Sequence, residues 1–222
     1  GQNIQIYEFG INVEYAYTKG VFLLAENNNK TILSYVPSED VDKSFQLDVL
    51  ATNNPNINFG VPCSMTWHKT IGSQTNNVLL IAAGNPSTVY QLDGYEMLSL
   101  FQTPVGEKVT QLEASSDIGT PKTMAITNNN LYSMGLNTTN IFAQTSRFTN
   151  AVGGSVTLAN RMTTWWRDDL FYAHADAYFD NAHGALLTMP IETTSIPAEI
   201  LKGTFTGDTL VGMGSVNKQR NM

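Results

Sequence analysis

Short apolar stretches separated by turn-forming residues are the main pattern along the chain. The stretches are rich in Val, Leu, Ile and Tyr, and clusters of Gly, Asn or Asp follow them. Such runs are typical of β-strands joined by tight connections. No long stretch repeats apolar residues with the 3.6-residue period of a helix, so we expect little helix. The pattern therefore predicts an all-β fold.

The strands recur as a unit. In each unit a short β-prone stretch leads into a turn, and an apolar strand that ends in small residues follows. The apolar second strands begin at Val21, Val78, Leu131, Leu170 and Leu210. These positions are 57, 53, 39 and 40 residues apart, a spacing that suits three or four antiparallel strands per unit. We therefore expect five units, the last of them incomplete because it stops after two strands.

Further strands follow the second strand of most units. The stretches "STVYQLD" (87–93) and "GALLTMP" (184–190) are predicted third strands, and "IFAQTSRF" (141–148) is another strand. Segments 52–60 and 149–155 are rich in Gly and Asn, and we expect them to be loops between units. No linker divides the chain, so residues 1–222 are predicted to be a single all-β repeat domain.

Units of this kind resemble the blades of a β-propeller, in the style of the quinoprotein and YVTN-like propellers. The resemblance covers most of the chain, but neither a Trp-Asp dipeptide at blade ends nor a regular kelch double glycine is present. It implies antiparallel blades of three or four strands, stacked radially so that both apolar faces of each sheet are buried. The incomplete fifth unit favours a partial propeller within a longer propeller-containing chain. A β-sandwich is the alternative fold.

Charge and composition exclude several partners. Charged residues are only 14% of the chain and the net charge is -7, so nucleic acid is not an expected partner. The longest apolar runs are far too short for a transmembrane segment. The single cysteine, Cys63, rules out an internal disulfide and Cys-based zinc motifs.

The low-charge composition, rich in Asn and Thr, resembles that of surface lipoproteins of Bacteroidetes. In those proteins such domains accompany carbohydrate uptake systems. The resemblance implies an extracellular, periplasmic or cell-surface location, and a glycan or protein ligand.

The stretch "HADAYFDNAH" (174–183) is the strongest candidate for a metal site. It contains His174, Asp176, Asp180 and His183, which together are an acceptable ligand set for Zn²⁺ or Mn²⁺. The spacing matches no recognised metal motif, however, and Asp and Asn also serve turns. We therefore expect a polar hairpin tip without a cofactor, and keep a divalent metal as the alternative.

Aromatic residues give the better indication of a ligand site. Trp165 and Trp166 are adjacent, so on a strand they would face opposite ways. Trp67 has the matching position in the second unit, which favours packing between units. Aromatic faces beside planar polar groups commonly hold sugar rings. The predicted ligand-binding residues are Trp165, Trp166, Arg167, Asp168, Tyr172 and Tyr178.

Recognised catalytic motifs are not found. The chain has no Gly-x-Ser-x-Gly nucleophile elbow and no phosphate-binding glycine loop followed by Lys. We therefore expect a non-enzymatic binding module. A hydrolase or lyase that uses Asp168, Asp169, His174 or Asp176 on a polysaccharide is one alternative, and a structural scaffold is the other.

Overall fold

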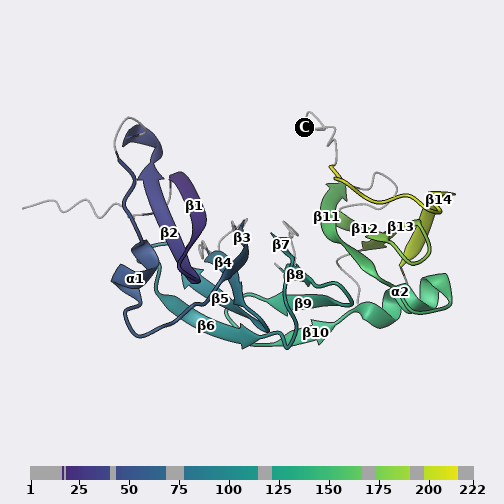
Figure 1. The fold of residues 1–222 in the computed structure, drawn as a ribbon, viewed down its shortest axis with the longest axis horizontal. Helices are drawn as coiled ribbons and strands as arrows, with labels where there is room; N and C mark the ends of the chain where they lie inside the picture. The colour runs from purple at the N-terminus through teal and green to yellow at the C-terminus, as the bar shows by residue number, and fades with distance from the viewer. Residues whose placement is uncertain are drawn as a thin grey trace, which may run out of the picture.

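The computed structural model describes residues 17, 19–40, 44–68, 78–114, 122–166, 174–190 and 198–214. This part of the chain forms four antiparallel sheets and two short α-helices (Figure 1), so the predicted all-β class and low helix content are confirmed. No helix in these ranges is both long enough and apolar enough to cross a membrane.

Each sheet is built from strands that are consecutive in sequence. The first sheet contains β1 (Gly20–Asn27) and β2 (Lys30–Pro37), followed by the 3-10 turn η1 (Ser38–Asp40) and α1 (Val49–Asn53). The second contains β3 (Pro62–His68), β4 (Val78–Gly84), β5 (Ser87–Asp93) and β6 (Ser99–Pro104). The third contains β7 (Gln111–Ala114), β8 (Lys122–Ile126), β9 (Leu131–Gly135) and β10 (Ile141–Ala143), followed by α2 (Thr145–Val152). The fourth contains β11 (Leu158–Trp166), β12 (His174–Asp180), β13 (Ala185–Pro190) and β14 (Glu199–Thr204).

The sheets pack face to face in series, with one apolar core between each pair of neighbours. The core between the first and second sheets includes Leu33, Leu50 and Ile81. The core between the second and third includes Leu80, Val89, Leu112 and Ala125. The core between the third and fourth includes Met124, Ile126, Phe148, Met162 and Leu187. Because the sheets follow one another, they are not the two layers of a simple sandwich.

The two middle sheets are covered on both faces. In β4, Leu79 and Ile81 belong to the core shared with the first sheet. Val78 and Leu80 belong to the core shared with the third. Successive side chains of a strand point to opposite faces, so a strand with neighbours on both sides must be apolar throughout. This explains the unbroken apolar sequence of β4.

Glutamine side chains link neighbouring sheets through backbone groups. Gln91 of β5 donates to Gly135 O (3.2 Å) and Thr138 O (2.8 Å) and accepts from Asn137 N (2.8 Å). Gln111 of β7 donates to Met162 O (3.3 Å) and accepts from Met162 N (2.9 Å). A primary amide offers both a donor and an acceptor, so one side chain satisfies two kinds of backbone group.

The sheets form an open arc in which β1, β3, β7 and β11, the first strands of their sheets, are neighbours along the inner side (Figure 1). Trp67 of β3 stacks on Phe22 of β1, with ring centroids 5.8 Å apart, which confirms the packing role expected for this tryptophan. Within the described ranges the sheets do not close into a ring.

The predicted repeat register is wrong in the third unit. Leu131 begins β9, the third strand of its sheet, and not the second. The displacement arises because β7 is a strand of only four residues, which the sequence pattern did not reveal. Val78, by contrast, begins a second strand as predicted, and β5 has the predicted bounds. Leu170 lies outside the described residues.

Two further expectations about elements are corrected. Within residues 198–214, the described part of the predicted fifth unit and its approach, no separate unit is formed, because Glu199–Thr204 is the fourth strand of the fourth sheet and Leu210 lies in no strand. The predicted strand 141–148 ends at Ala143. The helix α2 (Thr145–Val152) takes up most of the remaining residues of that stretch and the first part of the expected loop at 149–155. Phe148 on α2 is fully buried in the core between the third and fourth sheets, so tertiary packing stabilises this short helix.

Candidate functional site

The ends of the first strands define one edge of the arc. Ser64 Oγ of β3 accepts from Leu112 N of β7 at 2.9 Å. Further along β3, His68 Nε2 lies 3.2 Å from Lys122 O. Lys122 is next to Thr123, which pairs with Ala114 at the C-terminal end of β7. β3 and β7 therefore run in the same direction, and β11 runs alongside them (Figure 1). The C-terminal ends of β3, β7 and β11 consequently lie at the same edge, which we call the strand-end edge.

The predicted ligand residues begin at the strand-end edge. Trp165 and Trp166 are the last residues of β11, and their backbones pair with Ala175 and His174 of β12. The side chains of Trp165, Trp166 and His174 are outside the described part of the structure. Arg167, Asp168, Asp169 and Tyr172 lie wholly outside it. Their roles in ligand binding remain predictions.

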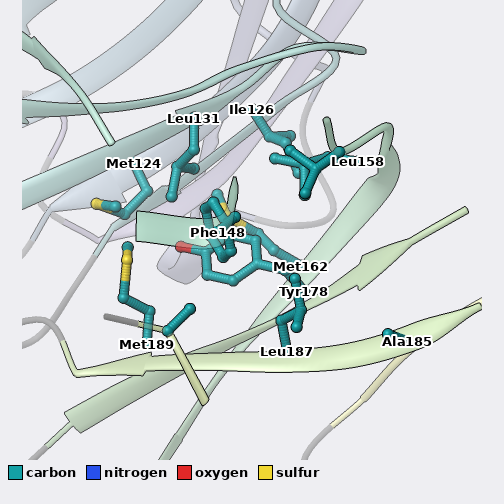
Figure 2. Close-up of a cluster of buried hydrophobic side chains, with 12 residues drawn as sticks. Met124, Ile126, Leu131, Phe148, Leu158, Met162, Tyr178, Ala185, Leu187 and Met189 are labelled. Atoms are coloured by element: carbon teal, nitrogen blue, oxygen red, sulfur yellow. The ribbon is translucent and has the colours of Figure 1, made fainter. Parts of the chain in front are cut away.

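Tyr178 lies in a different environment from the one expected for a ligand platform. Its side chain is fully buried between the third and fourth sheets, with its ring edge against Phe148 at 5.0 Å (Figure 2). The hydroxyl donates to Asp176 Oδ2 at 2.9 Å. Burial and the neighbouring Asp176 carboxylate raise the pKa of Tyr178 well above its usual value. With no exposed surface, Tyr178 supports the core and cannot contact an external ligand.

Four ionisable side chains gather at this interface. We call Glu113, Arg147, Asp176 and Tyr178 the interface cluster. Arg147 is 7% exposed, and this burial lowers the pKa of its guanidinium. A negative charge on Tyr178 would act in the opposite direction and raise the pKa of Arg147. Burial raises the pKa of Glu113, against a hydrogen bond from Gln111 to its carboxylate at 3.3 Å. The charge of Glu113 also contributes to the raised pKa of Tyr178.

The exposure of each side chain to solvent decides which chemistry the interface cluster can perform. Asp176 and Tyr178 have no exposed surface, whereas Glu113 is only partly buried. A carboxyl whose pKa is raised by burial can donate a hydrogen bond or a proton. A polysaccharide could not reach Asp176 without separation of the sheets, so the geometry favours a structural role for this carboxylate over the catalytic alternative.

The stretch 174–183 is mostly strand and not a hairpin tip. β12 runs from His174 to Asp180, and only residues 181–184 form the turn. Asp180 Oδ1 accepts from Thr157 N (2.9 Å) and Ala182 N (3.0 Å). Asp180 Oδ2 lies 2.5 Å from Nδ1 of the exposed His183. The Asp180 carboxylate thus closes the turn and ties it to the start of β11.

Two of the predicted metal ligands whose side chains are described, Asp176 and Asp180, lie apart on β12. Asp176 and Asp180 are four residues apart on a strand, so their Cα atoms are separated by about 13 Å. Among the described residues, no three His, Cys, Asp or Glu side chains come close enough to hold a metal ion. His174 cannot be placed in this comparison, because its side chain is outside the described part.

Sequence reasoning missed Glu113 and Arg147. Each is an isolated charged residue in an otherwise uncharged stretch, and no motif surrounds it. The alternation in "HADAYFD" did contain a usable signal, since Ala175, Ala177 and Phe179 alternate with polar residues as a strand requires.

Comparison with known proteins gave no family assignment. The sequence matches no protein-family model and no curated protein.

Proposed function

We propose that the chain is a non-enzymatic binding module of an exported or cell-surface protein. In this proposal its fold is a β-propeller or part of one, and it holds a glycan or protein ligand at the strand-end edge. The observation that carries the proposal is the serial packing of antiparallel sheets with β3, β7 and β11 as parallel neighbours. In such an arrangement, the loops that follow the first strands of several sheets start at the same edge. Loops that start at one edge can together form a binding site.

The sequence at that edge has the chemistry of a carbohydrate site. β11 ends in Trp165 and Trp166, and the next residues are Arg167, Asp168 and Asp169. Apolar faces of sugar rings pack on aromatic rings, while hydroxyl groups bond to carboxylates and guanidinium groups. The low charge and net charge of -7 are compatible with a neutral glycan and unfavourable for nucleic acid.

A scaffold role is the second candidate, and a specific observation favours it. Exposed apolar side chains lie on β1 and on the segment after β14, including Val21 (52% exposed) and Val211 (93% exposed). Exposed apolar groups of this kind indicate contact with another sheet or protein.

A thermal-shift screen of the purified chain against plant, host and microbial glycans tests the proposal. Binding to the folded state raises stability by RT ln(1 + [L]/Kd), about 2.7 kcal/mol at a hundredfold excess over Kd. A selective rise in Tm supports the binding module, and loss of that rise with a chelator would restore the metal alternative. Degradation of a glycan during incubation would contradict the non-enzymatic assignment.

Single substitutions locate the site. Trp165→Ala or Trp166→Ala should abolish glycan binding with a small change in Tm. Phe142→Ala is the matched control, because Phe142 is 60% exposed on β10, the outermost strand of the third sheet. Trp67→Ala should instead lower Tm, since Trp67 stacks on Phe22. If both tryptophan variants lose stability but retain binding, the strand-end edge is not the site.

A further inference from the structure

A cleft lies on the outer side of the fourth sheet, between its strands β12 and β13 and the segment that follows β14. Phe179 of β12 and Leu186 of β13 are cross-strand neighbours and form part of the cleft lining. Phe179 is only 4% exposed and its ring meets Phe205 edge-on at 6.0 Å, so the segment after β14 already covers the sheet here. The cleft is the space that this covering segment leaves open, and its volume is about 420 Å³.

One wall of the cleft is held in place by the turn at residues 205–208. Phe205 N donates to Gly184 O at 2.6 Å, and Asp208 N donates to Phe205 O at 2.9 Å. Gly184 has a φ of +56°, and a Cβ there would lie 2.5 Å from Phe205 O, so only glycine allows this approach. These backbone bonds hold Phe205 and Asp208, which both line the cleft, in fixed positions on one side of it.

The lining of the cleft is apolar apart from one acidic group. Asp208 is the only charged residue among the described residues that line it. Within the described part of the chain, the Asp208 carboxylate has no hydrogen bond or ion pair. The cleft therefore combines an apolar space with one unpaired negative charge. Its apolar lining residues are Phe179, Leu186, Phe205, Leu210, Val211 and Met213.

This lining restricts the chemistry of an occupant. A sugar needs several hydrogen-bonding partners, and the described lining offers only the Asp208 carboxylate and the Thr209 hydroxyl as polar side-chain groups. The volume is within the range of about 300–1,000 Å³ that is typical of small-molecule sites, and the apolar lining suits an apolar body. A positive group would pair with Asp208 and can also approach the ring of Phe205. The net charge of -7 further favours a cation.

We propose that this cleft binds a small amphipathic amine, with its apolar body against Phe179 and Leu186 and its ammonium group beside Asp208. The cleft is separate from the strand-end edge. Phe179 is five residues along β12 from His174, which pairs with Trp166, so the two places are about 17 Å apart. Because the place and the ligand chemistry both differ from those of the glycan site, this proposal does not depend on the proposed function.

Titration of the full chain with phenylbutylamine, followed by NMR of isotope-labelled methionine methyl groups, tests the proposal. The Met213 signal, identified by its loss in Met213→Leu, should shift because Met213 lines the cleft. At about pH 7 the amine is protonated, and we expect a Kd of about 0.1–1 mM for a molecule of this size. The Met65 signal is the internal control, since Met65 packs against the core between the first and second sheets. If the Met213 signal shows no saturable shift, or if Met65 shifts equally, the proposal is overturned.

Two probes with the same apolar body test the role of the positive charge. Phenylbutanol is neutral and phenylbutyrate is negative at about pH 7. Both should bind at least about two- to fivefold more weakly than the amine, which is the contribution expected from a partly exposed ion pair. Equal affinities of the three probes would show that the cleft does not select a cation, and would overturn the assignment of an amine.

Substitutions on the rim of the cleft give the sharper test. Asp208→Asn should weaken binding of the amine about two- to fivefold and leave binding of phenylbutanol unchanged. Val211→Lys adds a positive charge to the lining at a side chain that is 93% exposed, so it should weaken binding of the amine without lowering Tm. Phe142→Lys on β10 is the matched control, since it adds the same charge at a site that is 60% exposed and outside the cleft. Equal weakening by the two lysine substitutions would mean that the amine responds only to the net charge of the chain, and would overturn the proposal.

Discussion

β4 and β12 are the second strands of their sheets, yet they fill the space between sheets in opposite ways. β4 presents apolar side chains to both neighbouring sheets. β12 presents Asp176, Tyr178 and Asp180 toward the third sheet and Ala177 and Phe179 toward the outside. All five of these β12 side chains are buried. The same position in a sheet thus accommodates a simple apolar interior or a polar one, provided that the polar groups find partners.

The difference has an energetic consequence. Apolar packing in β4 depends on shape and volume, so removal of atoms leaves a cavity. Polar packing in β12 depends on specific hydrogen bonds, so removal of one partner leaves another polar group buried without its bond. The two strands should therefore respond differently to conservative and to truncating substitutions.

Leu80→Ala in β4 should cause the largest loss. Leu80 is fully buried between the second and third sheets. The expected decrease in the free energy of unfolding is about 2–5 kcal/mol, measured by urea denaturation. Leu100→Ala in β6 is the control, because Leu100 is 51% exposed and the change should be within about 0.5 kcal/mol. Equal effects of the two substitutions would contradict the two-sided burial of β4.

Asp176→Ala in β12 should cost about 1–3 kcal/mol, because it leaves the buried Tyr178 hydroxyl without the acceptor that it now has at 2.9 Å. Asp176→Asn keeps an acceptor oxygen and should cost less. Tyr178→Phe combined with Asp176→Ala should cost less than the sum of the separate changes. Additive losses in that double-mutant cycle would show that the two side chains do not act together.

Glu113→Gln should reveal the pH dependence of the interface cluster. Burial raises the pKa of Glu113 in the folded state, so folding favours its protonated form. The stability that this group contributes is fully present below its unfolded pKa and is lost as the pH rises through the folded pKa.

Glutamine does not titrate, so the variant should be more stable than the native chain at about pH 7 and should lose that advantage toward about pH 4. Tm at a series of pH values measures the difference. A constant difference across the series would mean that Glu113 ionises in the folded chain as easily as in the unfolded one.

His183→Ala should have the smallest effect. The His183 side chain is 40% exposed, so its contact with Asp180 should contribute at most about 0.5 kcal/mol. Asp180→Ala should cost about 1–2 kcal/mol, since its carboxylate also accepts from Thr157 N and Ala182 N. If the two substitutions cost the same, the role of Asp180 in holding the turn is wrong.

The sequence predicted elements well where local pattern and burial agree. β4 is a continuous apolar run that begins at the expected Val78, and β5, on the other side of an Asn-Pro turn, has the expected bounds. β7 was not predicted, because a strand of only four residues carries too little pattern, although it pairs with β8, the next strand in sequence. That omission displaced the repeat register of the third unit.

The candidate site was harder to predict, because its chemistry depends on contacts between sheets. Asp176 and Asp180 were interpreted as turn residues, and only the packing of α2 and β8 against β12 shows that both are buried. The position of Trp165 and Trp166 at a strand end agrees with the predicted strand. Glu113 and Arg147 lie far apart in sequence from Tyr178 and become its neighbours only when the third and fourth sheets meet.

The glutamine links between sheets make the interface tolerant to sequence change. Gln111 recognises Met162 through its main-chain N–H and C=O, which every residue except proline supplies. The same applies to the three backbone groups that Gln91 contacts. At these two junctions the polar part of the contact would therefore survive a change of side chain in the neighbouring sheet, and only the apolar core would have to be matched. Gene duplication, or a deliberate transplant of a sheet by protein engineering, would then have to match apolar volume while it keeps one glutamine per junction.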